Sequence, residues 1–209
     1  MNLSNTTSDQ LALKLQAGID ARHGQEDSAA VLVPLVPTAN GFDVVLEVRA
    51  LTLKHQPGEV CVPGGVRENG ESALQAAVRE TCEELLIDAD RITVIGDLGR
   101  IAGLGDFRVR AFVGVLDGYR GTFLADEVDR ICTVPLSWFL ENEPTVYRSN
   151  LVSEAPDDFP WDLIPHGRDY PFRRETHKTY FYHGTDPLIW GFTAHVLSDL
   201  ADSLKASEL

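Results

Sequence analysis

Two apolar runs near the start of the chain set the first predicted elements. Residues 28–36 and 42–49 are rich in β-branched and other apolar side chains, and a Pro-Thr-Ala-Asn-Gly segment lies between them. Runs of this length bounded by turn-forming residues are typical of β-strands. We therefore predict two strands joined as a hairpin.

Helical periodicity replaces this pattern shortly afterwards. Ser72 and Gln75 have the spacing of a capping box, which predicts a helix that begins just after Glu71. On a helical wheel, one face of this helix is apolar and the other carries the carboxylates of Glu80, Glu83 and Glu84. The apolar face comprises Leu74, Ala77, Val78, Thr81 and Leu85.

The remaining pattern predicts one domain that spans residues 1–209, with an N-terminal helix within residues 1–24. Further strands are predicted at 91–97, 107–116, 128–134 and 178–183, with a turn at 103–105, and helices from Pro135 and across 188–204. Residues 145–176 contain four prolines, which forbid a long helix. We predict an irregular insertion there, and favour a surface loop packed by its own aromatic residues over a substrate lid.

Composition narrows the class of protein. The chain has 209 residues and a formal net charge of −14, so it repels nucleic acid phosphates and we expect no nucleic acid partner. Its three cysteines are scattered and fit a reducing compartment. Neither a signal-peptide pattern nor an apolar segment of membrane-spanning length is found. We expect a cytoplasmic protein that does not enter a membrane.

The three carboxylates of the predicted helix form an unusual surface. Like charges three and four residues apart destabilise a helix, so these side chains need solvent or a cation. Hard divalent cations prefer such oxygen ligands. A solvated acidic face would explain an isolated Glu-x-x-Glu-Glu. Here Pro63-Gly64-Gly65 precedes the helix and lets backbone approach whatever the acids hold, which favours a cation site.

The spacing of these residues resembles a known motif. Gly65, five residues, Glu71, seven residues and then Arg79-Glu80-Thr81-Cys82-Glu83-Glu84 is similar to the Nudix box. The resemblance implies an α/β protein with a Nudix-type α/β/α sandwich and a mixed sheet. Leu86 stands where the family has glycine. We therefore predict that the helix continues toward Asp88 or ends without a Schellman motif, and that Leu86 has no positive φ.

The segment before the box narrows the resemblance. Arg49, Gly58 and Pro63-Gly64-Gly65 match a signature of coenzyme A diphosphatases, whereas Lys54 replaces an arginine and Val62 a phenylalanine. This implies hydrolysis of coenzyme A or acyl-coenzyme A to 3′,5′-ADP and 4′-phosphopantetheine. Two alternatives stay open: a diphosphatase of ADP-ribose, a dinucleotide or another nucleoside diphosphate derivative, or a catalytically silent nucleotide-binding regulatory module.

The resemblance also implies roles for individual residues. Glu80, Glu83, Glu84 and the Gly65 carbonyl would hold Mg²⁺ or Mn²⁺, and Glu80 could also take a proton from water. The general base could instead be a loop carboxylate, with Glu127 the first candidate and Asp126 the second. The pair Glu71 and Arg79 would support the acids. The residues expected at the substrate phosphates are Arg49, Lys54 and Arg67. The expected partner is a small nucleotide, and a homodimer is left open.

Overall fold

β1 (Ala29–Thr38) is the strand around which the main sheet is built. The computed structural model describes residues 7–10, 12, 27–102, 108–151, 155–172 and 175–206. β1 pairs antiparallel with β2 (Gly41–Arg49) through the predicted hairpin, and parallel with β6 (Arg108–Leu116). Near its start it also pairs with β4 (Gly64–Val66). The sheet is therefore mixed, as predicted.

Shorter and outer strands complete this sheet. β3 (Val60–Cys61) and β7 (Val128–Pro135) pair antiparallel with β2, and β5 (Ile92–Ala102) pairs antiparallel with β6. Within the described residues the sheet has seven strands, in the order β3-β2-β1-β6-β5 with β4 and β7 added to β1 and β2.

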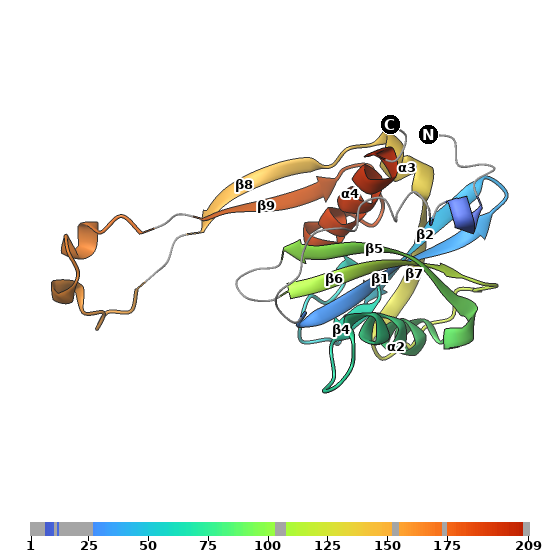
Figure 1. Ribbon diagram of the computed structural model, residues 1–209, viewed down its shortest axis with the longest axis horizontal. Helices are drawn as coiled ribbons and strands as arrows, with labels where there is room; N and C mark the ends of the chain where they lie inside the picture. The colour runs from blue at the N-terminus through green and yellow to red at the C-terminus, as the bar shows by residue number, and fades with distance from the viewer. Residues whose placement is uncertain are drawn as a thin grey trace.

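Helices cover both faces of the main sheet (Figure 1). α2 (Ala73–Leu85) packs on one face, where Ala76, Ala77 and Leu85 join a buried cluster with side chains of β1, β2 and β6. α4 (Gly191–Ala206) and the short α3 (Leu136–Glu141) pack on the other face over a larger cluster. The predicted α/β/α sandwich is confirmed, and α2 is the element that carries the three carboxylates.

The two ends of α2 differ in how well sequence predicted them. Ser72 and Gln75 make both bonds of the capping box, which confirms the start. The prediction for the other end is wrong, because Leu86 adopts a left-handed conformation with φ 51° and ψ 49°. Both Leu86 and Ile87 donate backbone N–H groups to the Cys82 carbonyl. This turn places Ile87 in the core, and its burial offsets the strain at Leu86.

A second sheet forms a projecting arm. β8 (Thr145–Leu151) and β9 (Glu175–Tyr182) make a long hairpin that leaves the body, and β10 (Ile189–Trp190) pairs with β9 (Figure 1). The segment expected to be irregular therefore begins with a regular strand. At its far end lie two 3₁₀ turns, η2 (Trp161–Leu163) and η3 (Gly167–Asp169). Another 3₁₀ turn, η1 (Ala89–Arg91), precedes β5.

Aromatic side chains pack together at the end of the arm. The Trp161 ring centroid lies 4.6 Å from that of Phe159 and 6.2 Å from that of Phe172. The Arg168 guanidinium lies over Trp161, with its Cζ 5.3 Å from the ring centroid. This small cluster is what the surface-loop interpretation of the segment describes.

Two sequence predictions fall mainly outside the described residues. One is the N-terminal helix, of which the structure describes only 7–10 and 12; there Thr7 and Gln10 exchange side-chain to backbone hydrogen bonds. The other is the turn at 103–105. Across the described part of the chain, no helix has the length and hydropathy needed to span a membrane.

Candidate active site

The three carboxylates of α2 differ in their exposure to solvent. Glu84 is 4% exposed, and its Oε2 accepts a hydrogen bond of 2.9 Å from the Gly64 N–H. Glu80 is partly buried, whereas the Glu83 side chain is 55% exposed. Burial raises the pKa of both Glu80 and Glu84. The helix therefore presents two shielded acids beside one solvated acid.

Arg79 holds this acidic face in place. Its Nε donates to Glu71 Oε1 over 3.0 Å, and its Nη1 to Glu80 Oε1 over 2.9 Å and to Glu83 Oε2 over 3.2 Å. Its Nη2 also donates to the Val66 carbonyl over 3.2 Å. The hydrogen bonds with Arg79 lower the pKa of Glu71. One guanidinium thus ties the loop before α2 to two of its carboxylates.

Gly65 lies against Glu80 more closely than another residue could. A Cβ built on Gly65 would lie 2.5 Å from Glu80 Cδ and overlap its Oε1. Gly64 is equally confined, with φ 153° and the Val31 Cα 2.6 Å from a built Cβ. These two glycines allow the β4 backbone to approach the acids.

The loop before β7 brings Glu127 to the same region. The Leu124 N–H donates to the Glu84 carbonyl over 2.8 Å, and the Ala50 N–H donates to the Glu127 carbonyl over 2.9 Å. These bonds fix the loop between α2 and the end of β2. The charge of Glu127 is among the causes that raise the pKa of Glu80 and Glu84. Asp126 is exposed one residue earlier.

A further nearby carboxylate, that of Glu47, was missed from the sequence. Glu47 lies on β2, is 1% exposed, and its pKa is raised first by burial and then by the charge of Glu84. Its Oε2 accepts a long hydrogen bond of 3.8 Å from Cys61 Sγ, and its Oε1 has no hydrogen-bond partner within the described part of the chain. The available signal was one acidic residue inside an apolar run, since such runs predict strands buried on both faces.

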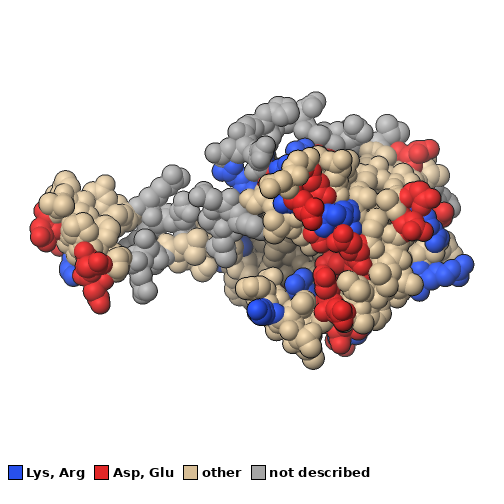
Figure 2. All heavy atoms as spheres, turned by 90° about the horizontal axis from the view of Figure 1, so that it is seen from below, with Lys and Arg blue, Asp and Glu red and all other residues tan. Residues whose placement is uncertain are grey.

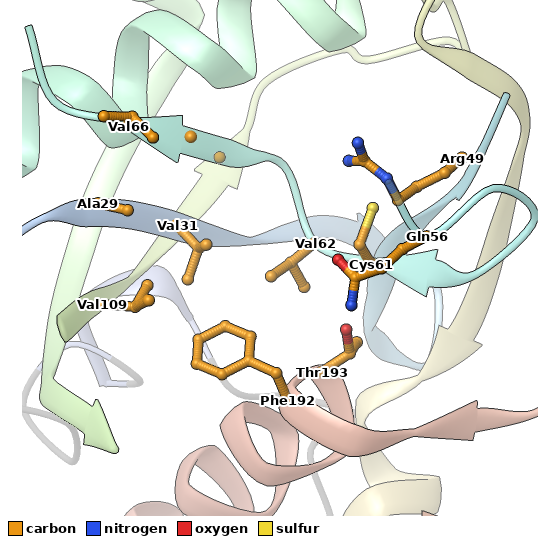
Figure 3. Close-up of a pocket in the computed structure, with 12 residues that line it drawn as sticks. Ala29, Val31, Arg49, Gln56, Cys61, Val62, Val66, Val109, Phe192 and Thr193 are labelled. Carbon is orange, nitrogen blue, oxygen red and sulfur yellow. The ribbon is translucent and has the colours of Figure 1, made fainter. Parts of the chain in front are cut away.

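A pocket of about 340 Å³ opens on the side of β4 that faces away from α2 (Figure 3). Its walls are largely apolar, and Phe192 and Thr193 at the start of α4 close one side. Arg49 lies at one end beside Cys61. Gly64 and Gly65 line this pocket and also contact the carboxylates of α2. The pocket and the acidic face therefore share a wall of two glycines.

The three cations expected at substrate phosphates lie in different settings. Arg49 lines the pocket, and its Nε donates to the His55 carbonyl over 3.4 Å. Lys54 is exposed on the loop that follows β2. Arg67 is directed elsewhere, because its Nε donates to the Glu71 carbonyl over 2.8 Å and its Nη1 to the Asp27 carbonyl over 3.0 Å. The structure thus brings only Arg49 of these three into the pocket.

The donor set fits a hard divalent cation, although the carboxylates have not converged. Among the described residues, no three His, Cys, Asp or Glu side chains are arranged as a ready-made metal site, and Arg79 engages both Glu80 and Glu83. Viewed from the α2 side, acidic side chains run in a band across the molecule with basic side chains between them (Figure 2). Burial first, and then repulsion by neighbouring carboxylates, raise the pKa of Glu80 and Glu84, and a cation would relieve that repulsion.

Comparisons with known proteins agree with this geometry. The family model of the NUDIX domain matches residues 27–158. The chain is 33% identical to the Mus musculus protein named "Peroxisomal coenzyme A diphosphatase NUDT7" over 148 residues, 70% of this chain and 62% of that protein. It is 32% identical to "Uncharacterized Nudix hydrolase NudL" of Photorhabdus laumondii over 183 residues, 85% of this chain and 84% of that protein. The match to the mouse protein thus spans less than two thirds of its length.

Proposed function

Because the chain belongs to the Nudix hydrolase family, we propose that it is a divalent-cation-dependent diphosphatase that cleaves coenzyme A or acyl-coenzyme A. The observation that carries the proposal is the wall of Gly64 and Gly65, which separates the carboxylates of α2 from an apolar pocket. A substrate with a pyrophosphate at this wall could place its remaining parts in the pocket. The name of the mouse relative supports coenzyme A as that substrate.

The cation would be Mg²⁺ or Mn²⁺, held by Glu80, Glu83, Glu84 and the Gly65 carbonyl. When bound, it neutralises phosphate oxygens and lowers the pKa of a coordinated water. Arg79 is the residue that must release Glu80 and Glu83 for this purpose, since it donates to both. Both carboxylate oxygens of Glu71 accept hydrogen bonds from Arg79, and these bonds would keep the guanidinium nearby.

Hydrolysis adds one water across the phosphoanhydride. The water oxygen bonds to one phosphorus, the bridging oxygen leaves with the other phosphate, and one water proton passes to a base. Glu127 is the proposed base, because its loop is pinned beside α2 by backbone hydrogen bonds to Ala50 and to Glu84. Asp126 and Glu80 are the alternatives. The products are 3′,5′-ADP and 4′-phosphopantetheine.

Substrate selection is assigned to the pocket. Arg49 offers a charge-assisted hydrogen bond to a phosphate, and the apolar wall around Phe192 suits an uncharged part of the substrate such as the pantetheine arm. One charge-assisted bond contributes roughly 1.5 to 3 kcal/mol, which corresponds to about tenfold or more in kcat/KM. Coenzyme A should therefore be cleaved with a higher kcat/KM than dephospho-coenzyme A or ADP-ribose.

The test is a substrate panel measured with Mg²⁺, with Mn²⁺ and with EDTA. Arg49→Ala should reduce kcat/KM for coenzyme A more than for ADP-ribose. Faster cleavage of ADP-ribose by the native protein would contradict the substrate assignment and leave the diphosphatase assignment intact. Cleavage at an unchanged rate in EDTA would contradict the cation dependence.

Glu83→Gln tests the acidic face itself. Because the Glu83 side chain is 55% exposed, its charge contributes little to stability, and the melting temperature should hardly change. Turnover should fall by about 10²-fold or more if Glu83 is a ligand. Unchanged turnover would show that Glu83 is not a ligand of the cation. Homodimer formation and a cytoplasmic location stay predictions, and sedimentation and cell fractionation would test them.

A further inference from the structure

The buried carboxylate of Glu47 has no role in the reaction described above. It is 1% exposed near the end of β2, and among the described residues its Oε1 has no hydrogen-bond partner. Its Oε2 receives a hydrogen bond from Cys61 Sγ, which at 3.8 Å is a weak interaction. A buried carboxylate is costly unless a charge or hydrogen bonds compensate it, so this oxygen needs an explanation.

The register of β2 directs Glu47 toward α2. Successive side chains on a strand point to opposite faces, and Val45 packs in the buried cluster beneath α2. Glu47, two residues later, points to the same face. Its strongest charged neighbour is Glu84, followed by Arg49 and Glu127. The Glu47 side chain therefore lies on the face of the sheet that α2 covers, near Glu84.

Positive charge is scarce at this point. Glu84 accepts a hydrogen bond from the Gly64 N–H, whereas Arg79 donates hydrogen bonds to Glu80 and Glu83. Arg49 is the cation whose charge favours the ionised forms of both Glu47 and Glu84. Two buried acids therefore share one partly exposed arginine, and burial disfavours the ionised form of both carboxyl groups.

We infer that Glu47 is a further carboxylate ligand of the divalent cation, supplied by the sheet and not by the Nudix box. The inference rests on the proposed cation-dependent function. Mg²⁺ and Mn²⁺ favour six oxygen ligands, so carboxylates added to those of α2 replace bound waters. A cation would also provide the compensating charge and the missing partner of Oε1.

Cation binding by the intact protein, without substrate, tests this directly. Mn²⁺ affinity and stoichiometry are measured by calorimetry and by the electron spin resonance signal of free Mn²⁺, at one fixed pH. The variants are Glu47→Gln, which keeps the shape of the side chain, and Glu47→Asp, which keeps its charge but shortens it. Asp43→Asn is the matched control, because Asp43 lies on the same face of β2, about 13 Å along the strand.

Glu47→Gln should weaken Mn²⁺ binding by at least about tenfold, and Glu47→Asp should weaken it to a smaller extent. Asp43→Asn should bind as the native protein does. In EDTA, Glu47→Gln should melt above the native protein, because Gln has no carboxyl group whose ionised form is disfavoured by burial. Added Mn²⁺ should raise the melting temperature of Glu47→Gln less than that of the native protein.

The outcomes separate this inference from the proposed function. If Glu83→Gln loses Mn²⁺ affinity while Glu47→Gln binds and gains stability like the native protein, Glu47 is not a ligand and the function stands. If the native protein itself binds no Mn²⁺ at millimolar concentration, the cation dependence fails together with this inference.

Discussion

Two glycines of the box region allow a matched experiment on the active site. Gly65→Ala places a methyl group 2.5 Å from Glu80 Cδ, whereas ordinary carbon contacts lie at about 3.5 to 4.0 Å. Since Gly65 has no positive φ, its backbone accepts alanine and the Glu80 carboxylate must withdraw by about 1 Å. Gly70→Ala has the opposite character, because φ is 84° and no atom lies within 4 Å of the new Cβ.

The two variants should therefore fail in different ways. A displacement of about 1 Å in a catalytic group can cost about 10²-fold in rate, so Gly65→Ala should lose activity by about that factor. Its stability should change little, because the Glu80 side chain can swing toward solvent. Gly70→Ala should retain activity, and left-handed strain of about 1 to 2 kcal/mol, partly offset in the unfolded chain, should lower its melting temperature by a few degrees.

The assay combines kcat for coenzyme A hydrolysis in Mn²⁺ with thermal melting of the same preparations. A Gly65→Ala variant with native kcat would show that the position of Glu80 does not matter. A Gly65→Ala variant that melts well below Gly70→Ala would show that the glycine is required for folding and not for the placement of a carboxylate.

Three further substitutions test other parts of the structure. Leu86→Gly removes left-handed strain at a half-exposed side chain, so it should melt within a few degrees of the native protein and above Leu86→Ala; the reverse order would contradict the role of strain. Burial lowers the pKa of His195, which stacks on Tyr180, so stability should fall as the pH drops below about 6.5. His195→Gln should flatten this pH dependence in melts from pH 5 to 7. An unchanged slope would mean that another group causes the pH dependence. Thr193→Val leaves the Val60 carbonyl without its 2.9 Å donor, and should lower the free energy of unfolding by about 1 to 3 kcal/mol in urea; no change would mean that water replaces the hydroxyl.

Local signals explain which parts of the fold were predictable. The β1–β2 hairpin and the start of α2 depend on residues close in sequence, so their apolar runs and the Ser72 cap sufficed. The end of α2 depends on a distant interaction, the burial of Ile87 in the core, and this overrides the preference of Leu86. β8 was missed because the prolines that follow it suggested irregular structure for the whole segment.

The residues of the candidate site likewise fall into those that local spacing predicts and those that it does not. Glu80, Glu83 and Glu84 share one helix, and periodicity alone places them on one face. Glu47 lies near Glu84 only because folding brings β2 and α2 into one buried cluster, a relation that no local spacing contains. The setting of Arg67 was likewise hidden, since its guanidinium bonds to the carbonyl of Asp27, far away in sequence.

The position of β1 at the centre of the sheet has a consequence for biosynthesis. Its hairpin partner β2 follows at once, but its other edge pairs Ala30 with Arg110 and can be covered only after β6 has been synthesised. Until then a long apolar strand presents an open edge, which is a template for association with other chains. Pairing across such a separation is also slow. A lower growth temperature, which weakens hydrophobic association, should therefore increase the soluble yield of this protein more than that of a helical protein of equal length.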